Sequence, residues 1–563
     1  MHSTSRIPLF LGLTAFVLTG LFVNHGLVNS PLPAGPGLTL DESFNIDQGV
    51  YLAEALERHG PLLFEPQTAR EVFQAKRFLP DHPPLGRLLI GLAHQSTSWL
   101  IPGSEGTVYN VAAARLGSCL AFAIMVFAMT RFSLRYYDVS TAIATGLMLI
   151  GLPHLMGHAR LAALETSTNL AWMAAVLPLM TWWTGEKPPS LFRVLISGIF
   201  FGLLLLTKVQ GILLPPAVVV WSLVRFRQQA FLPLVFWGLC GGCVFLAGWP
   251  WVWSDPMNHV LQYLGRTTER PTLYCWYLGQ RFDDRMVPWH YPVVMLLLSL
   301  PAWTLAGIGL RICQGRLDRR EQFLLLASAV PLFVFAIPGV PVYDGTRLFL
   351  VSLPGVAFMA GRGIGPLLNS TVRLSAVFRR VTVDHDDPMH ARSAGSVERK
   401  AAAAFRWSGR TLLTAALLLA APIPWTLQPF AINQYGMLAG GNRGAAALGL
   451  EAGYWADALN ADFWNSVPEG STVFVAPVSH QFQLPDLELL VPVIQHRKIR
   501  LIAWEYDLEK QHGLLLLIHR LADLRVNLRV DPAGSQQISD VRLSGVLLAR
   551  LIRAEPSRSG SWK

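Results

Sequence analysis

The sequence predicts a mainly α-helical protein, a polytopic transmembrane helix bundle followed by a small α/β region outside the membrane. Three observations lead to this prediction: the composition, the recurrence of long apolar runs, and a change of pattern near residue 429. Of the 563 residues, 52% are hydrophobic and only 15% are charged. This balance is typical of multi-span membrane proteins and excludes a soluble globular chain of this length.

Eleven apolar runs approach the roughly 20 residues that a helix needs to cross a bilayer. They lie at about 7–24, 110–130, 138–156, 163–183, 191–207, 210–224, 230–249, 289–311, 321–339, 346–366 and 411–428. Several runs are short or closely coupled, so ten to thirteen spans fit the pattern. No clear small-residue cleavage site follows the first run, which favours an uncleaved span over a signal peptide.

Basic residues set the predicted orientation, because cytoplasmic loops are enriched in lysine and arginine. The net charge of +10 gathers in short clusters at every second connection, a pattern that does not indicate a nucleic-acid partner. The clusters are Arg131 and Arg135, Lys187 and Arg193, Arg225 and Arg227, Arg311 to Arg320, and the loop 373–410. An odd number of spans from a cytoplasmic N-terminus then places the loop 25–109 and the C-terminal segment outside.

Two domains are expected. The first, 1–428, is transmembrane and includes the outer loop 25–109 and the cytoplasmic loop 367–410; the second, 429–563, lies outside the membrane. The second domain is predicted as α/β because short strand-like runs alternate with helical and turn-rich stretches. The clearest runs are Thr472–Val478, Leu501–Tyr506 and Gly545–Leu551.

Two features that suggest metal or redox chemistry have simpler interpretations. The acidic run Asp384–Asp387 belongs to a polar, arginine-rich loop that we interpret as solvated and partly disordered. Cys240 and Cys243 form a CxxC pair, but they lie in a glycine-rich span, where small residues pack helices closely. The five cysteines are scattered and odd in number, so a disulfide framework is not predicted.

The outer loop begins with an acidic pair, Asp41 and Glu42, ahead of a helix with apolar residues at helical spacing. Two interpretations remain open. Thr39 and Glu42 fit a capping box and Asp41 is favourable in the first helical turn, which explains both acids without catalysis. Alternatively, the carboxylates take part in a reaction.

A second cluster, Asp81 to Arg87, reads Asp-His-Pro-Pro-Leu-Gly-Arg and precedes an apolar helix. Two prolines fix an extended approach and then permit a helix to start, so a rigid turn is the simplest interpretation. In that case His82 and Arg87 lie at the lipid headgroups.

Further ionisable residues lie inside or beside predicted spans, where they are costly and usually face a protein interior or a water-filled cavity. Anchoring at the membrane interface explains each of them alone. The predicted topology, however, brings one set to the outer surface: Asp41, Glu42, His82, Arg115, Arg160, Glu165, Lys208, Asp344 and Arg347. This convergence suits a reaction on an anionic, phosphate-linked substrate.

At Asp41-Glu42 with Phe44, and at Asp81-His82-Pro83-Pro84-Leu85-Gly86-Arg87, the sequence resembles the protein O-mannosyltransferase and aminoarabinose transferase superfamily, membrane glycosyltransferases of the GT-C fold. The resemblance covers roughly the first 430 residues and extends to Arg115, Ala159–Glu165, Lys208 and Tyr343–Arg347. Arg87 stands where the eukaryotic mannosyltransferases usually have lysine, and the C-terminal region does not resemble their sugar-binding repeats. Protein mannosylation is therefore not implied.

The resemblance implies a glycosyltransferase that moves a sugar from a polyprenyl-phosphate carrier to an envelope acceptor (lipid, glycan or protein) with inversion at the anomeric carbon. It implies Asp41 as general base, with Glu42 orienting the loop or the sugar. Arg347 and Lys208 would compensate the charge on the phosphate, supported by His82 and Arg115. The other predicted substrate-binding residues are Arg87, Arg160, Glu165 and Asp344.

The expected location is a bacterial inner membrane, with the site and the C-terminal domain facing outside. Expected partners are the lipid-linked donor, the acceptor and membrane lipids, with no nucleic acid. No defined cofactor is predicted, and a divalent cation is left open. A transporter or flippase of a lipid-linked substrate is the alternative, but transporters usually carry internal repeats and we find none in the sequence.

Overall fold

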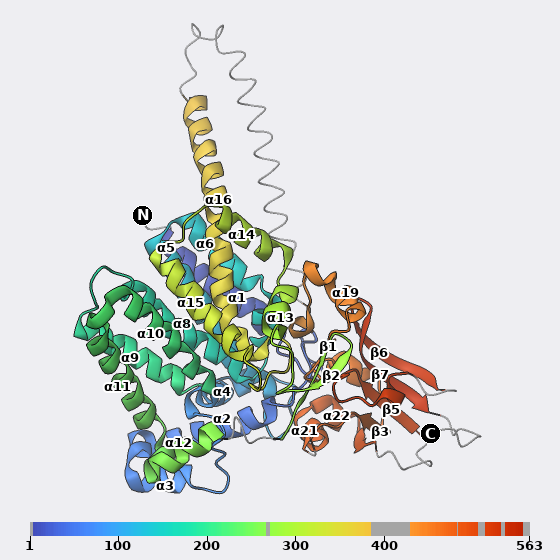
Figure 1. Ribbon diagram of the computed structural model, residues 1–563. Coiled ribbons are helices and arrows are strands. Elements are labelled where there is room, and N and C mark those ends of the chain that lie inside the picture. The colour runs from blue at the N-terminus through green and yellow to red at the C-terminus, as the bar shows by residue number, and fades with distance from the viewer. Residues whose placement is uncertain are drawn as a thin grey trace, which may run out of the picture.

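A computed structural model describes residues 4–265, 271–383, 428–480, 482–504, 513–530 and 535–554. A helical region, coloured blue to yellow, lies beside a mixed sheet, coloured orange to red (Figure 1). Within the described residues, helices dominate up to Val383, and the main sheet starts at Thr472. The prediction of a mainly helical chain with a small sheet region is confirmed.

The helices of the N-terminal part coincide with the predicted apolar runs. They are α1 (Ile7–Gly20), α5 (Val111–Tyr136), α6 (Val139–Ile150), α7 (Pro153–His158), α8 (Leu164–Trp182), α9 (Leu191–Leu205), α10 (Leu214–Phe226), α11 (Phe231–Gly248), α13 (Tyr291–Ser299), α14 (Ala302–Cys313), α15 (Arg319–Phe335) and α16 (Leu353–Val383). The predicted run at 411–428 lies outside the described residues except for its last position.

The count of eleven spans is not confirmed. Among the described residues, three helical stretches are long and apolar enough to cross a bilayer, at Val111–Tyr136, Val209–Gly248 and Arg347–Leu368. A fourth is added if α13 and α14, bent by 107°, form one broken span. Helices α1, α6 and α9 are apolar but shorter than 18 residues, whereas a straight span needs about 20 residues at 1.5 Å each. The chain is a multi-pass membrane protein.

Helix α16 changes the predicted boundary of the long basic loop. We expected the span to end near residue 366 and a loop to follow at 367–410. The helix instead continues to Val383, with Pro366 inside it. The rest of that loop, including Asp384–Asp387, lies outside the described residues.

Connections with the predicted cytoplasmic charges meet at one end of the helical region. Tyr137 donates a hydrogen bond to Asp318 at 2.9 Å. Arg319 and Arg225 both pair with Glu186, at 2.6 Å and 2.8 Å respectively. These connections therefore share one end of the bundle, as the basic-residue pattern predicts.

Residues 25–109, the predicted outer loop, contain helices α2 (Glu42–His59), α3 (Pro66–Phe73) and α4 (Pro84–Thr97), with α12 (Pro256–Gly265) nearby (Figure 1). Helices α2 and α4 pack backbone to backbone at Gly49 and Gly91. A Cβ atom on Gly91 would lie 1.9 Å from the carbonyl oxygen of Gly49. This close crossing holds the start of α2 next to the Asp81–Arg87 turn.

The main sheet has five strands in the order β4-β3-β5-β7-β6. Strands β4 (Arg500–Ala503), β3 (Thr472–Ala476) and β5 (Gly513–Ile518) are parallel, while β7 (Val546–Ala554) and β6 (Gln536–Leu543) complete the sheet in antiparallel fashion. In register, Val475 lies opposite Ala503 on one side and Leu516 on the other. All three predicted strand runs are confirmed.

A two-stranded hairpin between α12 and α13 was not predicted. Strands β1 (Tyr274–Tyr277) and β2 (Gln280–Asp283) pair in antiparallel fashion. Leu278 and Gly279 form the turn with φ of 49° and 77°, the left-handed pair that matches the twist of a tight hairpin. The turn lacks an Asn-Gly or Asp-Gly signal, which explains why the sequence did not indicate it.

The sheet shares a hydrophobic core with the outer loop. Ile46 and Val50 of α2 belong to the same buried cluster as Val475 and Leu516 of the sheet. Short helices complete this packing: α19 (Gly441–Ala447), α20 (Ala461–Ser466), α21 (Gln483–Leu490) and α22 (Pro492–His496). The main-chain carbonyl of Leu490 bonds to His25 Nε2 at 2.9 Å. The sheet is therefore docked firmly on one end of the helical region.

Candidate active site

A cavity of about 1370 Å³ lies between the helical region and the sheet. Five of the ten predicted site residues line it: Asp41, His82, Lys208, Asp344 and Arg347. The other five do not line this cavity and are buried: Glu42, Arg87, Arg115, Arg160 and Glu165. The structure thus separates residues that can touch a ligand from residues that support them.

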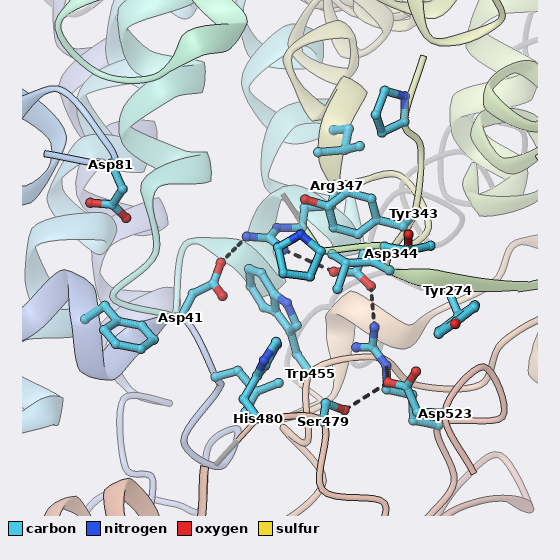
Figure 2. Close-up of a pocket in the computed structure, with 18 of the residues that line it drawn as sticks. Asp41, Asp81, Tyr274, Tyr343, Asp344, Arg347, Trp455, Ser479, His480 and Asp523 are labelled. Carbon is cyan, nitrogen blue, oxygen red and sulfur yellow. Dashed lines mark hydrogen bonds and ion pairs between the residues drawn. The ribbon is translucent and has the colours of Figure 1, made fainter. Parts of the chain in front are cut away.

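Arg347 lies at the centre of the site, between Asp41 and Asp344 (Figure 2). Its guanidinium forms an ion pair with Asp41 and bonds to Glu165 at 2.9 Å and to Asp344 at 3.1 Å. It also stacks over Trp455 with 4.1 Å to the ring centroid. The arginine guanidinium holds its N–H donors in a fixed plane, which suits simultaneous contacts with several carboxylates. A lysine ammonium group could not make the same set of contacts.

The turn that carries Asp344 is conformationally unusual. Asp344 and Gly345 both have left-handed φ angles, 56° and 62°. The backbone N–H of Gly345 donates to the Tyr291 hydroxyl at 3.0 Å. A non-glycine residue in this region costs energy, and here the turn aims the Asp344 carboxylate at Arg347.

Glu165 holds the two cations of the site in place. One of its carboxylate oxygens accepts bonds from Lys208 Nζ at 2.6 Å and from Arg347 Nε at 2.9 Å. The Glu165 side chain is buried and does not line the cavity. We had expected Glu165 to bind substrate; in the structure its carboxylate contacts Lys208 and Arg347 and does not line the cavity.

Asp41 is the exposed carboxylate of the site. It precedes α2, but its side chain makes no capping hydrogen bond, and 40% of the side chain is exposed. The capping interpretation therefore does not account for Asp41. The capping box at Thr39 and Glu42 is only half formed, because the Thr39 N–H and hydroxyl both donate to Glu42, at 2.9 Å and 3.0 Å.

Glu42 and Arg115 form a fully buried ion pair away from the cavity. Arg115 bonds to both carboxylate oxygens, at 2.7 Å and 2.8 Å, and the backbone N–H of Ala162 donates to Glu42 at 2.7 Å. Burial alone would raise the pKa of Glu42, but the charge and hydrogen bonds of Arg115 lower it below its ordinary value. The remaining Arg115 donors bond to the carbonyls of Val23, Pro36 and Gly37.

These contacts correct two expectations. Arg115 has no donor left for a phosphate, and Glu42 does not reach a sugar in the cavity. Together they tie the start of α2 to α5 and to the segment that precedes α8, so they shape the wall that presents Asp41.

The Asp81–Arg87 turn is closed by a second ion pair. Arg87 contacts both oxygens of Asp81, at 2.5 Å and 2.9 Å, and also bonds to Asn45 of α2 at 3.3 Å. Arg87 is buried and turned away from the cavity, contrary to its predicted substrate contact, whereas Asp81 and His82 line the cavity. Burial lowers the pKa of His82 to about 4, so this side chain is a neutral hydrogen-bonding group near pH 7.

Arg160 is also buried outside the cavity. It donates to the carbonyl of Gln428 at 2.7 Å and lies over the ring of Phe22. We had expected a substrate contact, but the side chain joins the α7–α8 connection to the segment that starts at Gln428.

The wall on the sheet side was missed by the sequence analysis, which placed every acid and phosphate-binding candidate before residue 429. Arg520, after β5, pairs with Asp344 at 3.3 Å and with Asp523 at 2.6 Å. Ser479, after β3, donates to Asp523 at 2.9 Å. Polar residues after parallel strands are a known signal for ligand crevices, but that signal requires the strand pairing to be known.

Within the described ranges, no group of three or more His, Cys, Asp or Glu side chains is arranged to hold a metal ion. The carboxylates of the cavity are paired with cationic side chains instead.

Residues 81–253 match the family described as dolichyl-phosphate-mannose-protein mannosyltransferase. The match covers less than half of the 563 residues. The matched segment contains Asp81, His82 and Lys208 of the cavity, while Asp41 and Arg347 lie outside it. A search of the curated proteins found no significant match.

Three solved structures have low similarity to this chain. Apo ArnT from Cupriavidus metallidurans is 12% identical, covering 96% of this chain and 97% of that chain, with a TM-score of 0.48. The same enzyme bound to undecaprenyl phosphate is 14% identical over the same shares, with a TM-score of 0.46. The oligosaccharyltransferase AglB from Archaeoglobus fulgidus, in complex with an inhibitory peptide and a dolichol-phosphate, is 11% identical, covering 87% of this chain and 64% of that chain, with a TM-score of 0.43.

Proposed function

We propose that the protein is an integral-membrane glycosyltransferase that moves a sugar from a polyprenyl-phosphate carrier to an envelope acceptor. One observation carries the proposal: two cations, Lys208 and Arg347, and a carboxylate, Asp41, face the same cavity. The family match to mannosyltransferases that use a dolichyl-phosphate sugar agrees with it.

The donor binds with its phosphate at Lys208 and Arg347, where charge-assisted hydrogen bonds are strongest. The same cations stabilise the negative charge that develops on the leaving phosphate. Next to them the cavity wall is apolar, formed by Ile212, Leu213, Val334, Phe335 and Leu348. This wall suits the first isoprene units of the carrier, and His82 supplies a neutral hydrogen bond.

Asp41 acts as the general base. Its carboxylate accepts the proton of the acceptor hydroxyl as that oxygen bonds to the anomeric carbon. The bond from the anomeric carbon to the phosphate oxygen breaks, and its electron pair leaves with the polyprenyl phosphate. Because Arg347 pairs with Asp41, phosphate binding at Arg347 frees the carboxylate for the acceptor.

The proposed organisation follows from the position of the cavity. Residues 1–428 form the transmembrane glycosyltransferase domain and 429–563 an extramembrane domain that closes the cavity. Lys187 and Arg319 mark the cytoplasmic end of a bacterial inner membrane protein, and the cavity opens on the outer face.

The test uses the full chain in nanodiscs with a radiolabelled polyprenyl-phosphate sugar and acceptor-containing envelope extract. We expect release of polyprenyl phosphate together with transfer of label, both lost in Asp41→Asn. Movement of intact donor across a vesicle membrane without release of polyprenyl phosphate would instead identify a flippase.

A further inference from the structure

The cavity wall opposite Asp41 is built from the carboxyl ends of three neighbouring parallel strands. Ser479 follows β3, Trp504 follows β4, and Arg520 and Asp523 follow β5. In open α/β sheets, ligands bind outside the carboxyl ends of the strands. The mechanism proposed above uses none of these four side chains, so their function is unassigned.

Three of these residues form a connected polar strip. Asp523 accepts a hydrogen bond from Ser479 at 2.9 Å and pairs with Arg520 at 2.6 Å, and Figure 2 shows Ser479 and Asp523 side by side on this wall. Arg520 continues the strip to Asp344 at 3.3 Å. The strip therefore runs from the sheet to the turn that holds Arg347.

The loop that carries Arg520 and Asp523 is held in place by hydrogen bonds to its backbone. The half-buried Glu451 carboxyl group accepts bonds from the backbone N–H groups of Leu521, at 2.5 Å, and Ala522, at 3.2 Å. Arg281 of the hairpin donates to the carbonyl of Ala522 at 2.7 Å. A wall fixed in this way has little entropy to lose when a ligand binds, which favours binding.

Aromatic rings flank the strip. Trp504 and Tyr274 both line the cavity. Arg281 covers one face of Tyr274, with 3.4 Å to the ring centroid. Aromatic side chains offer a large apolar surface next to polar groups, which matches the apolar face of a sugar ring bordered by hydroxyls.

The charge of this wall argues against a strongly anionic ligand. Its cations are Arg281, Arg520 and Arg525, and its acids are Asp344 and Asp523. Arg520 is paired with both acids. Three cations and two acids leave this wall with a net charge of one positive unit. A neutral ligand that both donates and accepts hydrogen bonds fits this mixture better than a phosphate or a carboxylate.

We infer that the strip Ser479–Asp523–Arg520, with Trp504, is the acceptor subsite and binds a neutral saccharide. Asp523 and Arg520 bond to hydroxyl groups of the acceptor sugar, and Trp504 packs against its ring. This inference rests on the proposed function and deepens it, because it selects a glycan among the lipid, glycan and protein acceptors considered above.

The test measures saccharide binding without requiring transfer. Mannobiose, cellobiose and chitobiose are added to the full chain in nanodiscs, and binding is followed by saturation-transfer NMR. At least one disaccharide should bind, and its affinity should fall roughly 10- to 100-fold in Asp523→Asn and Trp504→Ala, the loss of a charge-assisted bond or a packed ring. Ser479→Ala is a milder variant that should weaken binding by a smaller factor without affecting folding.

Matched controls lie outside the cavity. Asp462→Asn and Trp289→Ala replace exposed residues of the same types and should bind the disaccharide as the wild type does. Equal binding by Asp523→Asn and Asp462→Asn overturns the inference, and so does the absence of binding by all three disaccharides. Binding of inorganic phosphate or of a serine-rich peptide that is lost in Asp523→Asn would also overturn it.

The two proposals fail in different ways. Asp41→Asn should bind the disaccharide normally, because Asp41 is not part of the strip. Asp41-dependent sugar transfer without disaccharide binding would refute the subsite alone. Disaccharide binding without any Asp41-dependent transfer would refute the proposed function.

Discussion

Arg347 pairs with Asp41 across the cavity and thereby joins the turn before α16 to the start of α2, 306 residues away in the sequence. The contact occupies the arginine that we assign to the donor phosphate. In the proposed mechanism the donor phosphate therefore displaces Asp41 from Arg347 before the acceptor hydroxyl bonds to Asp41, so the donor binds first and the acceptor second.

The first prediction concerns the base. Asp41→Asn should retain donor binding, with the affinity unchanged or raised because Arg347 loses a competing carboxylate, while transfer falls by roughly 10²- to 10⁴-fold, as general-base loss does. Helix α2 should stay intact, because the Asp41 side chain makes no capping bond. Donor binding and single-turnover transfer are measured in nanodiscs, with Asp47→Asn from the same helix as the control. Transfer by Asp41→Asn at the wild-type rate would remove its assignment as base.

The second prediction concerns the cation. Arg347→Gln should weaken donor binding by roughly 10- to 150-fold, the value of a charge-assisted hydrogen bond in a partly buried site. Turnover should fall as well, because the same charge stabilises the leaving phosphate. Arg77→Gln, which alters an exposed arginine outside the cavity, is the matched control. Unchanged donor affinity and turnover in Arg347→Gln would make this arginine purely structural.

The sequence predicted the helices well because their signal is local. Each apolar run from 7 to 366 contains a helix, and proline or glycine often lies near the breaks between them. The number of spans was harder to predict, since α13 and α14 turn by 107° and no local signal says whether two short helices form one span. The strands at Thr472 and Arg500 were likewise visible from their alternating pattern.

The sequence identified the ionisable residues of the site, but it did not show which of them line the cavity and which are buried away from it. Glu42 and Arg115 looked equivalent to Asp41 and Arg347 as charges near predicted span ends. Only the packing of α2 against α5 reveals that the first pair is sealed from the cavity. Arg520 was missed for a related reason, because its position depends on the pairing of β3 with β5, whose partner residues, such as Val473 and Leu514, are 41 positions apart in the sequence.

The third prediction tests the buried pair. Arg115→Met leaves the Glu42 carboxylate buried and unpaired and should destabilise the protein by about 3–5 kcal/mol. The double variant Glu42→Leu with Arg115→Met should recover much of this loss, since no uncompensated charge remains. Thermal unfolding in detergent measures the stability of the wild type, the two single variants and the double variant, which together form a double-mutant cycle. Additive effects of the two substitutions would show that the pair does not act as a unit.

The fourth prediction tests sidedness. In a functional variant without cysteines, Pro66→Cys and Ser535→Cys should react with an impermeant maleimide applied to spheroplasts. Lys187→Cys should react only after permeabilisation, because Lys187 adjoins the Glu186 cluster at the opposite end of the bundle. Labelling of Lys187→Cys in intact spheroplasts would reverse the proposed orientation.

The fifth prediction follows from Glu451, whose burial behind the acceptor strip raises its pKa from 4.5 to about 8. Between these values the folded protein binds more protons than the unfolded chain, so stability falls as pH rises and then levels off above about pH 8. Glu451→Gln is neutral at every pH and can still accept the Leu521 N–H bond. The unfolding temperature of Glu451→Gln should therefore rise relative to that of the wild type from pH 5 to pH 8, and the difference between the two should stay constant at higher pH.

Glu469→Gln, at an exposed position, is the control, and its unfolding temperature should equal that of the wild type at every pH. The measurement is tryptophan fluorescence during thermal unfolding in detergent, and a pH-independent difference between Glu451→Gln and the wild type would show that Glu451 is already ionised in the folded protein.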